Sequence, residues 1–248
     1  MPWDFVAILL VLGVIVPWRG AVRIRELLRQ PTLTTTERIA VYASTIAFQW
    51  LAVAVVLWRT TMHHIGLARL GVALPSLPLA AFASVALLAP LLANQVYALR
   101  RLARLPPEQQ GFLGALARKL MPQNPVESLA FIALVATVAV CEELLYRGFV
   151  FTAFYAASGG FLAAAIVGSS LMFSLAHLYQ GRRGLLATFV VGLLLASARA
   201  WTASLAPCVI VHFFVDLVAG LAAPRWLRAG SAAVESTTGA APAGEEGR

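Results

Sequence analysis

Long apolar runs alternate with short polar stretches along the chain as far as residue 223. A helix that crosses a bilayer needs about 20 mostly apolar residues, and such runs predict seven spanning helices here. They are expected at residues 5–18, 39–58, 71–99, 127–157, 159–179, 184–201 and 204–223. The pattern therefore predicts an all-α fold, a polytopic membrane bundle.

Some of these runs are irregular in length or composition. The first is short, and it is expected to recruit flanking residues. The run at 71–99 contains three prolines, which predicts either a kink or a start as a surface stretch. The run at 127–157 is too long for one simple span, so it is expected to extend beyond the membrane or to break near Gly148. An apolar stretch within 109–126 would raise the number of spans to eight, although a helix lying in the membrane interface fits it better.

The composition also fits a membrane protein. Hydrophobic residues make up 60% of the chain and charged residues 12%, whereas a soluble domain carries about 25% charged residues. The net charge of +8 would suit a nucleic-acid partner, but the basic residues are scattered over short loops with no soluble domain to hold such a site. We therefore expect no nucleic-acid partner, and a lipid bilayer as the surroundings.

The distribution of Lys and Arg predicts the orientation of the bundle. Loops and flanks on one predicted side carry fourteen of these residues, against three on the other. Cytoplasmic loops are the ones rich in Lys and Arg, so the N-terminus is expected outside and the C-terminus in the cytoplasm. The Ala- and Arg-rich, Lys-poor composition is typical of a GC-rich bacterium, which predicts a bacterial inner membrane as the location.

A few ionisable side chains lie inside the apolar runs. Of the eleven acidic residues only Glu142, Glu143 and Asp216 do so, and His177 and His212 lie in two further runs. Holding a charge at membrane depth costs about 2.5–3.5 kcal/mol on insertion scales, so such residues usually mark a working site. Two glutamates, two histidines and an aspartate facing one another would make a catalytic centre.

The spacing around the two glutamates indicates a division of labour. Glu143 and Arg147 are four residues apart, so they share a helix face and can pair. Glu142 is rotated from Glu143 by about 100°, with Tyr146 one turn on. We therefore expect Glu143 to be held structurally and Glu142 to be free for chemistry. Gly148 removes a side chain where another helix could approach closely.

Two more pairs are each one helical turn apart. One is Phe173 with His177, and the other is His212 with Asp216. Asp216 either orients His212, or both point into the cavity as separate ligands or donors. The spacing alone leaves both arrangements open.

These three groups of residues resemble the motifs of a known family. Residues 142–148 match EExxxR followed by Gly, residues 173–177 match FxxxH, and residues 212–216 match HxxxD or HxxxN. Their order and spacing resemble the CPBP family of intramembrane proteases, which groups type II CAAX prenyl endopeptidases with bacterial bacteriocin-processing and immunity proteins. The resemblance covers about residues 130–220.

The resemblance implies a role for each matching position. Glu142 is expected to activate a water molecule with help from His177, and His212 with Asp216 to stabilise the oxyanion or complete the site. Asn is more frequent than Asp at the position of Asp216, and a carboxylate donates a hydrogen bond only when protonated. An aspartate therefore favours a ligand or His-orienting role. The supporting residues are Glu143, Arg147, Tyr146 and Phe173.

The sequence leaves the use of a metal open. Glu142, His177, His212 and Asp216 would be an acceptable Zn²⁺ ligand set, and the family is often labelled as metalloproteases. The chain has no HExxH helix, and activation of water by glutamate and histidine without a metal accounts for the same residues.

The motifs favour one function over two alternatives. We expect an intramembrane endopeptidase that hydrolyses a peptide bond in a membrane-associated peptide or protein, with a catalytic core at 127–223. Residues 1–126 would supply further membrane helices and basic loops, and residues 224–248 a disordered cytoplasmic tail. A proton- or solute-coupled transporter would normally show more spans and an internal repeat. A non-catalytic immunity or scaffold protein would use these residues only to hold the bundle together.

Overall fold

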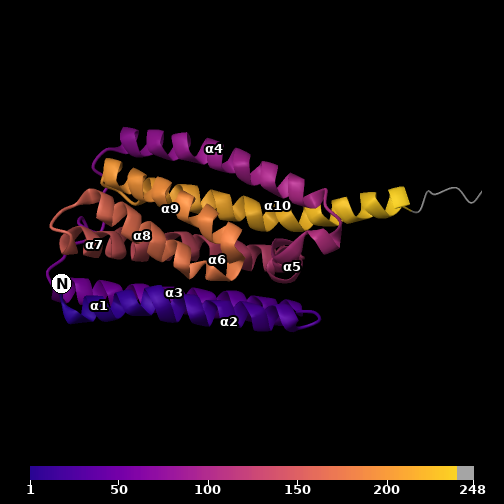
Figure 1. Cartoon of the computed structure of the whole chain (residues 1–248), viewed down its shortest axis with the longest axis horizontal. Helices are drawn as coiled ribbons and strands as arrows, with labels where there is room; N and C mark the ends of the chain where they lie inside the picture. The colour runs from indigo at the N-terminus through magenta and orange to yellow at the C-terminus, as the bar shows by residue number, and fades with distance from the viewer. Residues whose placement is uncertain (239–248) are drawn as a thin grey trace, which may run out of the picture.

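The protein is an elongated bundle of roughly aligned helices (Figure 1). The structure, a computed structural model, describes residues 1–238, with side chains to residue 227. Within the described residues there is no strand, and six helices are long and apolar enough to cross a membrane. A seventh apolar helix, Leu162–Ala176, is shorter. The predicted all-helical membrane bundle is confirmed, with six full-length candidate spans and one short one.

The first spanning helix is longer than the predicted run at 5–18. It is continuous over 27 residues from Trp3 to Arg29. Gly13 lies at its centre, and a Cβ at that glycine would meet the sulfur of Met172 at 2.8 Å. The glycine therefore lets a neighbouring helix approach closely at this depth. The helix comprises α1 (Trp3–Leu10), a π-helical turn η1 (Val11–Ile15) and α2 (Val16–Arg29).

Helix α3 (Thr35–Met62) begins at a capping box. The Thr34 hydroxyl accepts a hydrogen bond from the Glu37 backbone N–H, and the Glu37 carboxylate accepts one from Thr34 N–H at 2.8 Å. This reciprocal pair satisfies two backbone donors that the helix start leaves unpaired. The next helix, α4 (Leu77–Ala103), starts after residue 76. The first residues of the predicted 71–99 run are therefore a surface stretch, one of the two arrangements expected.

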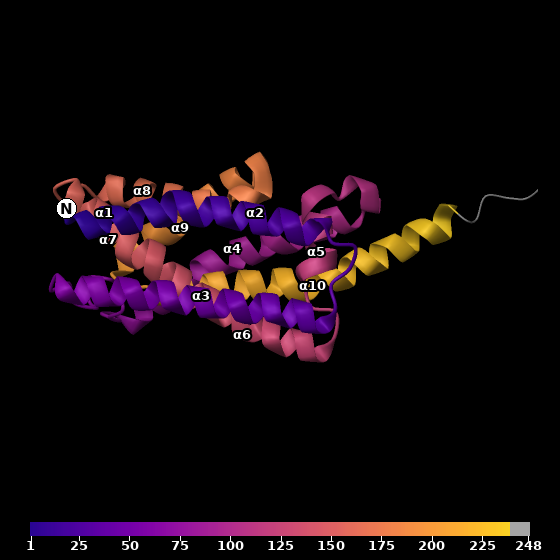
Figure 2. The same cartoon turned by 90° about the horizontal axis from the view of Figure 1, so that it is seen from below.

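The stretch at 109–126 does not supply an eighth span. It holds a ten-residue helix, α5 (Gly111–Leu120), which follows a short 3₁₀ turn, η2 (Pro107–Gln109). Ten residues rise only about 15 Å, which is half the thickness of the hydrocarbon core. In the bundle α5 lies at the same end as the α2–α3 connection and the C-terminal part of α10 (Figures 1 and 2). We call this the basic end, because its basic residues include Arg29, Arg104, Arg118 and Lys119.

The long run predicted at 127–157 is one continuous helix of 33 residues. It does not break near Gly148, but its winding changes from α-helical to π-helical at Glu143. A Cβ at Gly148 would lie 3.1 Å from the carbonyl oxygen of Leu70. The glycine does admit a close neighbour, but that neighbour is the α3–α4 connection and not a helix. The segments are α6 (Pro125–Glu142), η3 (Glu143–Val150) and α7 (Phe151–Ala157).

The last three helices differ in length. Helix α8 (Leu162–Ala176) has 15 residues, and a short turn η4 (Leu178–Gln180) joins it to α9 (Gly181–Thr202). Because α8 rises only about 22 Å, this turn stops short of the basic end (Figures 1 and 2). Helix α10 (Ala206–Thr238) follows. The tail predicted as disordered is thus helical as far as Thr238, and its remainder lies outside the described residues.

A buried ion pair joins α3 to α6 near the basic end. Arg38 Nη1 lies 2.7 Å from Glu127 Oε1, and both side chains are almost fully buried. The same carboxylate accepts hydrogen bonds from the Thr35 hydroxyl and from the Gln123 backbone N–H, each at 2.7 Å. Arg38 Nε also donates to the Lys119 carbonyl at 2.9 Å. These bonds satisfy both charges, so the pair can hold α3 against the start of α6.

We expect Arg38→Met to lower the free energy of unfolding by about 3–5 kcal/mol, because it leaves the Glu127 carboxylate buried without its cation. The double variant Arg38→Met/Glu127→Met should regain much of that loss, since no buried charge is left over. Unfolding in detergent micelles followed by circular dichroism measures both. Equal stability of the wild type and the single variant would contradict this account.

Candidate active site

The first motif lies where the long helix changes its winding. Glu142 is the last residue of α6, and Glu143 opens the π-helical segment η3. Such segments are rare and are frequently found at functional sites. Glu143 Oε1 accepts a hydrogen bond from Arg147 Nη1 at 3.0 Å, and both side chains are fully buried. The predicted pairing of these two residues is confirmed.

The carboxylate of Glu143 also reaches α10. Its Oε1 lies 2.7 Å from His212 Nδ1, and because a carboxylate only accepts, Nδ1 must be the donor. The other ring nitrogen, Nε2, lies 3.4 Å from Asp216 Oδ2. The Asp216 side chain is 42% exposed, against 8% for His212. Nδ1 is therefore anchored in the interior, while Nε2 faces the more open side.

The ring of Phe173 on α8 lies at the centre of the cluster. The guanidinium carbon of Arg147 is 3.9 Å from the ring centroid, which is a cation–π contact. Ring centroids of Tyr146, His177 and His212 lie 5.4, 4.7 and 5.9 Å away. One aromatic side chain thus touches residues of all three motifs, so the motifs come together in space.

His177 caps the C-terminal end of α8. Its Nδ1 lies 2.9 Å from the carbonyl oxygen of Phe173, and since a carbonyl accepts, Nδ1 carries the proton. In the neutral ring Nε2 then keeps its lone pair and can accept a proton. Because α8 is short, His177 lies at the level of the first motif although the connecting turn η4 follows it directly.

Glu142 points away from Glu143, as its position on the helix predicts. Its Oε1 accepts a hydrogen bond from Gln49 Nε2 on α3 at 2.9 Å. Its Oε2 is buried, and no side chain in the described part of the chain bonds to it. Gln49 was not predicted from the sequence because it carries no charge, although an amide in the apolar run at 39–58 is a weaker signal of the same kind.

More buried polar atoms of the cluster have no hydrogen-bond partner within the described residues. They are Glu143 Oε2 and two nitrogens of Arg147, Nε and Nη2. Buried polar atoms are nearly always satisfied, by protein or by ordered water. These unpaired atoms make the centre of the bundle polar, so a water molecule would be better accommodated there than an apolar side chain.

The predicted Zn²⁺ ligand set of Glu142, His177, His212 and Asp216 is not assembled. Within residues 1–227 no three His, Cys, Asp or Glu side chains are grouped so that they could hold a metal ion. Carboxylates face both ring nitrogens of His212, and a carbonyl takes one nitrogen of His177. The residues as arranged do not fit a Zn²⁺ site.

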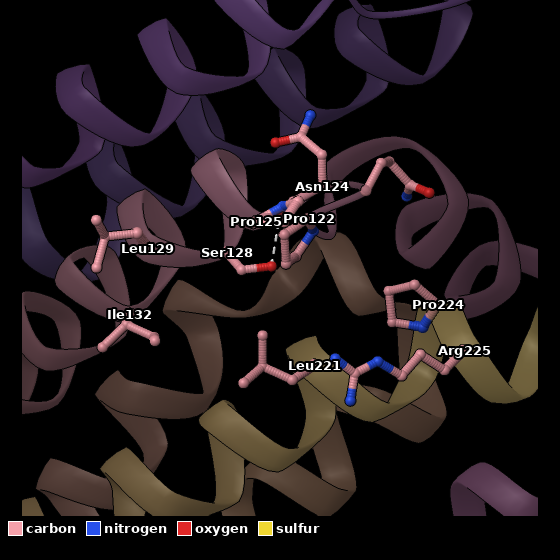
Figure 3. A pocket seen from close by; sticks show the side chains of 10 residues that line it. Pro122, Asn124, Pro125, Ser128, Leu129, Ile132, Leu221, Pro224 and Arg225 are labelled. Atoms are coloured by element: carbon pink, nitrogen blue, oxygen red, sulfur yellow. Dashed lines mark hydrogen bonds between the residues drawn. The ribbon is translucent and has the colours of Figure 1, made fainter.

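Neither of two cavities in the bundle contains a predicted site residue. The larger, about 450 Å³, lies between the start of α6 and the C-terminal half of α10 (Figure 3). From Ile132 on its wall to Glu142 the helix rises about 15 Å. The smaller, about 270 Å³, includes Phe5, His63 and Phe149 among its lining residues. The polar cluster is therefore part of neither cavity.

Comparison with known families agrees with the motifs. Residues 124–218 match the family model described as "Type II CAAX prenyl endopeptidase Rce1-like". The matched segment runs from the N-cap of α6 into α10 and contains all the predicted site residues, whereas Gln49 lies outside it. The resemblance to the CPBP proteases is thereby confirmed. No curated protein and no solved structure matches the chain.

We expect Glu143→Ala to lower the free energy of unfolding by about 3–5 kcal/mol, because Arg147 would stay buried without its carboxylate. Glu142→Ala should cost only about 1 kcal/mol, since it removes a single hydrogen bond from the neutral amide of Gln49. Denaturation of the purified protein in detergent measures both values. A Glu142→Ala variant as unstable as Glu143→Ala would contradict the division of labour between the two glutamates.

Proposed function

We propose that this protein is an intramembrane endopeptidase that hydrolyses a peptide bond in a membrane-associated peptide or protein, of the CAAX-processing or bacteriocin-processing kind. The observation that carries the proposal is the convergence of three motifs on the Phe173 ring. One glutamate there is paired to an arginine, and within the described residues its neighbour keeps one carboxylate oxygen without a partner. The family match of the same segment supports it.

In this proposal Glu142 is the general base and then the general acid. Its Oε2 removes a proton from a water molecule that His177 Nε2 helps to hold, and the water oxygen attacks the carbonyl carbon of the scissile bond. When the tetrahedral intermediate collapses, the C–N bond breaks and Glu142 returns the proton to the leaving amine. Such proton transfer by a positioned side chain contributes typically 10²–10⁴-fold to the rate, as an order of magnitude.

The oxyanion of the intermediate needs a positioned donor. His212 Nε2 suits this role when the ring carries a proton on both nitrogens, because Glu143 then fixes the ring through Nδ1–H and Nε2–H points toward the exposed side. Asp216, next to Nε2, orients the ring before substrate arrives. Arg147 holds Glu143 in turn, so the ion pair acts on the reaction only through the position of the imidazole.

The location follows from the positions of the basic residues. The α2–α3 connection, α5 and the C-terminal part of α10 share one end of the bundle (Figure 2), and that end carries Arg29, Arg104 and Arg118. Because cytoplasmic flanks are rich in Lys and Arg, we place this end and the C-terminus in the cytoplasm of a bacterial cell. The active site would then lie within the membrane, reached by substrates that are themselves membrane-bound.

We expect Glu142→Ala and His177→Ala to lose cleavage by about 10²-fold or more, because each removes a group that handles the water proton. The assay is hydrolysis of a quenched peptide library by detergent-purified protein, with circular dichroism as the control for folding. Near-full activity in either variant would contradict the mechanism.

The same assay with a Zn²⁺ chelator tests metal dependence. Activity kept with the chelator but lost in Glu142→Ala indicates a glutamate-dependent reaction without an exchangeable metal. Loss that is reversed by adding metal would overturn the metal-free mechanism. Solute flux in proteoliposomes that depends on Glu142, without cleavage, would favour the transporter instead.

Substitutions of Asp216 separate the effect of its charge from the effect of its contact with His212 Nε2. We expect Asp216→Asn to keep kcat within about tenfold of wild type, because an amide oxygen still accepts from His212 Nε2. Asp216→Ala should lose more, since nothing then orients the ring. Steady-state kinetics on one cleaved peptide compares them, and an Asn variant as impaired as the Ala variant would show that the negative charge itself is required.

A further inference from the structure

Gln49 reaches the proposed base from outside the family segment. It lies on α3, and its Nε2 donates to Glu142 Oε1 at 2.9 Å. In the described part of the chain this is the only hydrogen bond made by the Glu142 carboxylate. Since the carboxylate can only accept, the amide must present its N–H and not its carbonyl oxygen. The contact therefore fixes one oxygen of Glu142, while Oε2 has no hydrogen-bond partner among the residues that the structure describes.

Gln49 is held in place by the packing of α3 against α6. Arg38 and Tyr42 lie 11 and 7 residues before it on α3, about three and two helical turns away, so the three share a face. Arg38 pairs with Glu127, and the Tyr42 ring packs against Phe131 at 5.7 Å. These contacts anchor the same two helices that carry Gln49 and Glu142, so the amide is presented by a rigid element.

The two adjacent glutamates have partners of different charge. Glu143 is paired with a guanidinium, so its carboxylate is one half of a buried ion pair. Glu142 has a neutral amide instead, which orients the carboxylate without a full positive charge beside it. A general base has to be oriented and still be able to take up a proton, and a neutral donor meets both needs.

We infer that Gln49 is a positioning residue for the proposed reaction: it holds Oε1 of Glu142 so that Oε2 faces the water to be activated. The inference rests on the proposed function and extends it, because it makes a residue from the N-terminal helices part of the site. Helix α3 then serves as more than a membrane anchor.

The test compares three variants of the full-length protein on a peptide that the wild type cleaves in a Glu142-dependent way. Gln49→Leu removes the donor at similar size. Gln49→Glu keeps the shape but replaces the amide by a carboxyl group. Thr45→Val is the matched control, one turn earlier on α3, because among the described residues the Thr45 hydroxyl bonds only to the Val41 carbonyl of its own helix.

We expect Gln49→Leu to lower kcat about 10- to 100-fold while KM stays within about twofold, because the change affects the base and not substrate binding. Gln49→Glu should be at least as impaired at neutral pH, because an ionised partner repels Glu142. Thr45→Val should behave as wild type in all readouts.

Failure of the role inferred for Gln49 and failure of the proposed function give different results. Glu142-dependent cleavage with the same kcat in Gln49→Leu as in the wild type would overturn this inference and leave the proposed function intact. A fall in kcat that matches a loss of folded protein, measured by thermal unfolding, would make Gln49 merely structural and also overturn it. If the wild type shows no Glu142-dependent cleavage, the proposed function fails and this inference fails with it.

Discussion

The buried carboxylate of Glu143 is the interaction on which the centre of the bundle depends. A single oxygen of it bonds to Arg147 on its own helix and to His212 on α10. A charge at this depth is costly unless it is paired and hydrogen-bonded. Removal of any one of the three side chains therefore leaves a buried polar group without its partner. Phe173 covers the guanidinium from α8 and thereby fixes a third helix to the same point. The polar cluster thus holds three helices together and is also the candidate active site.

Two irregularities of the helices bring the motifs to one level. The π-helical segment that starts at Glu143 rewinds the long helix just where its polar side chains must point in different directions. Helix α8 ends after 15 residues, so His177 lies inside the bundle although a turn follows it directly. Regular helices of full length would place His177 nearer the basic end, away from the other two motifs.

The sequence predicts those parts of the site that depend on local spacing. Glu143 with Arg147 and His212 with Asp216 are neighbours because residues four apart share a helix face, and the apolar runs predict most of the helices. The π-helical segment could not be read from spacing, because residues four apart share a face in either winding. The short α8 could not be read either, because the apolar run at 159–179 extends beyond both of its ends. Gln49 was missed because its partner lies 93 residues away, and nothing local marks such a contact. The helical continuation of α10 to Thr238 was also missed, because small polar residues give no apolar period.

The two glutamates of the first motif show how a membrane interior can assign different roles to identical side chains. Their positions differ by one residue, yet one faces a cation and an imidazole while the other faces a neutral amide. The first environment holds the carboxylate in a buried ion pair, and the second orients it without a cation beside it. Because the neutral partner comes from α3, the family segment alone does not complete this arrangement. The N-terminal helices and the segment at 124–218 are therefore best regarded as one site-forming unit.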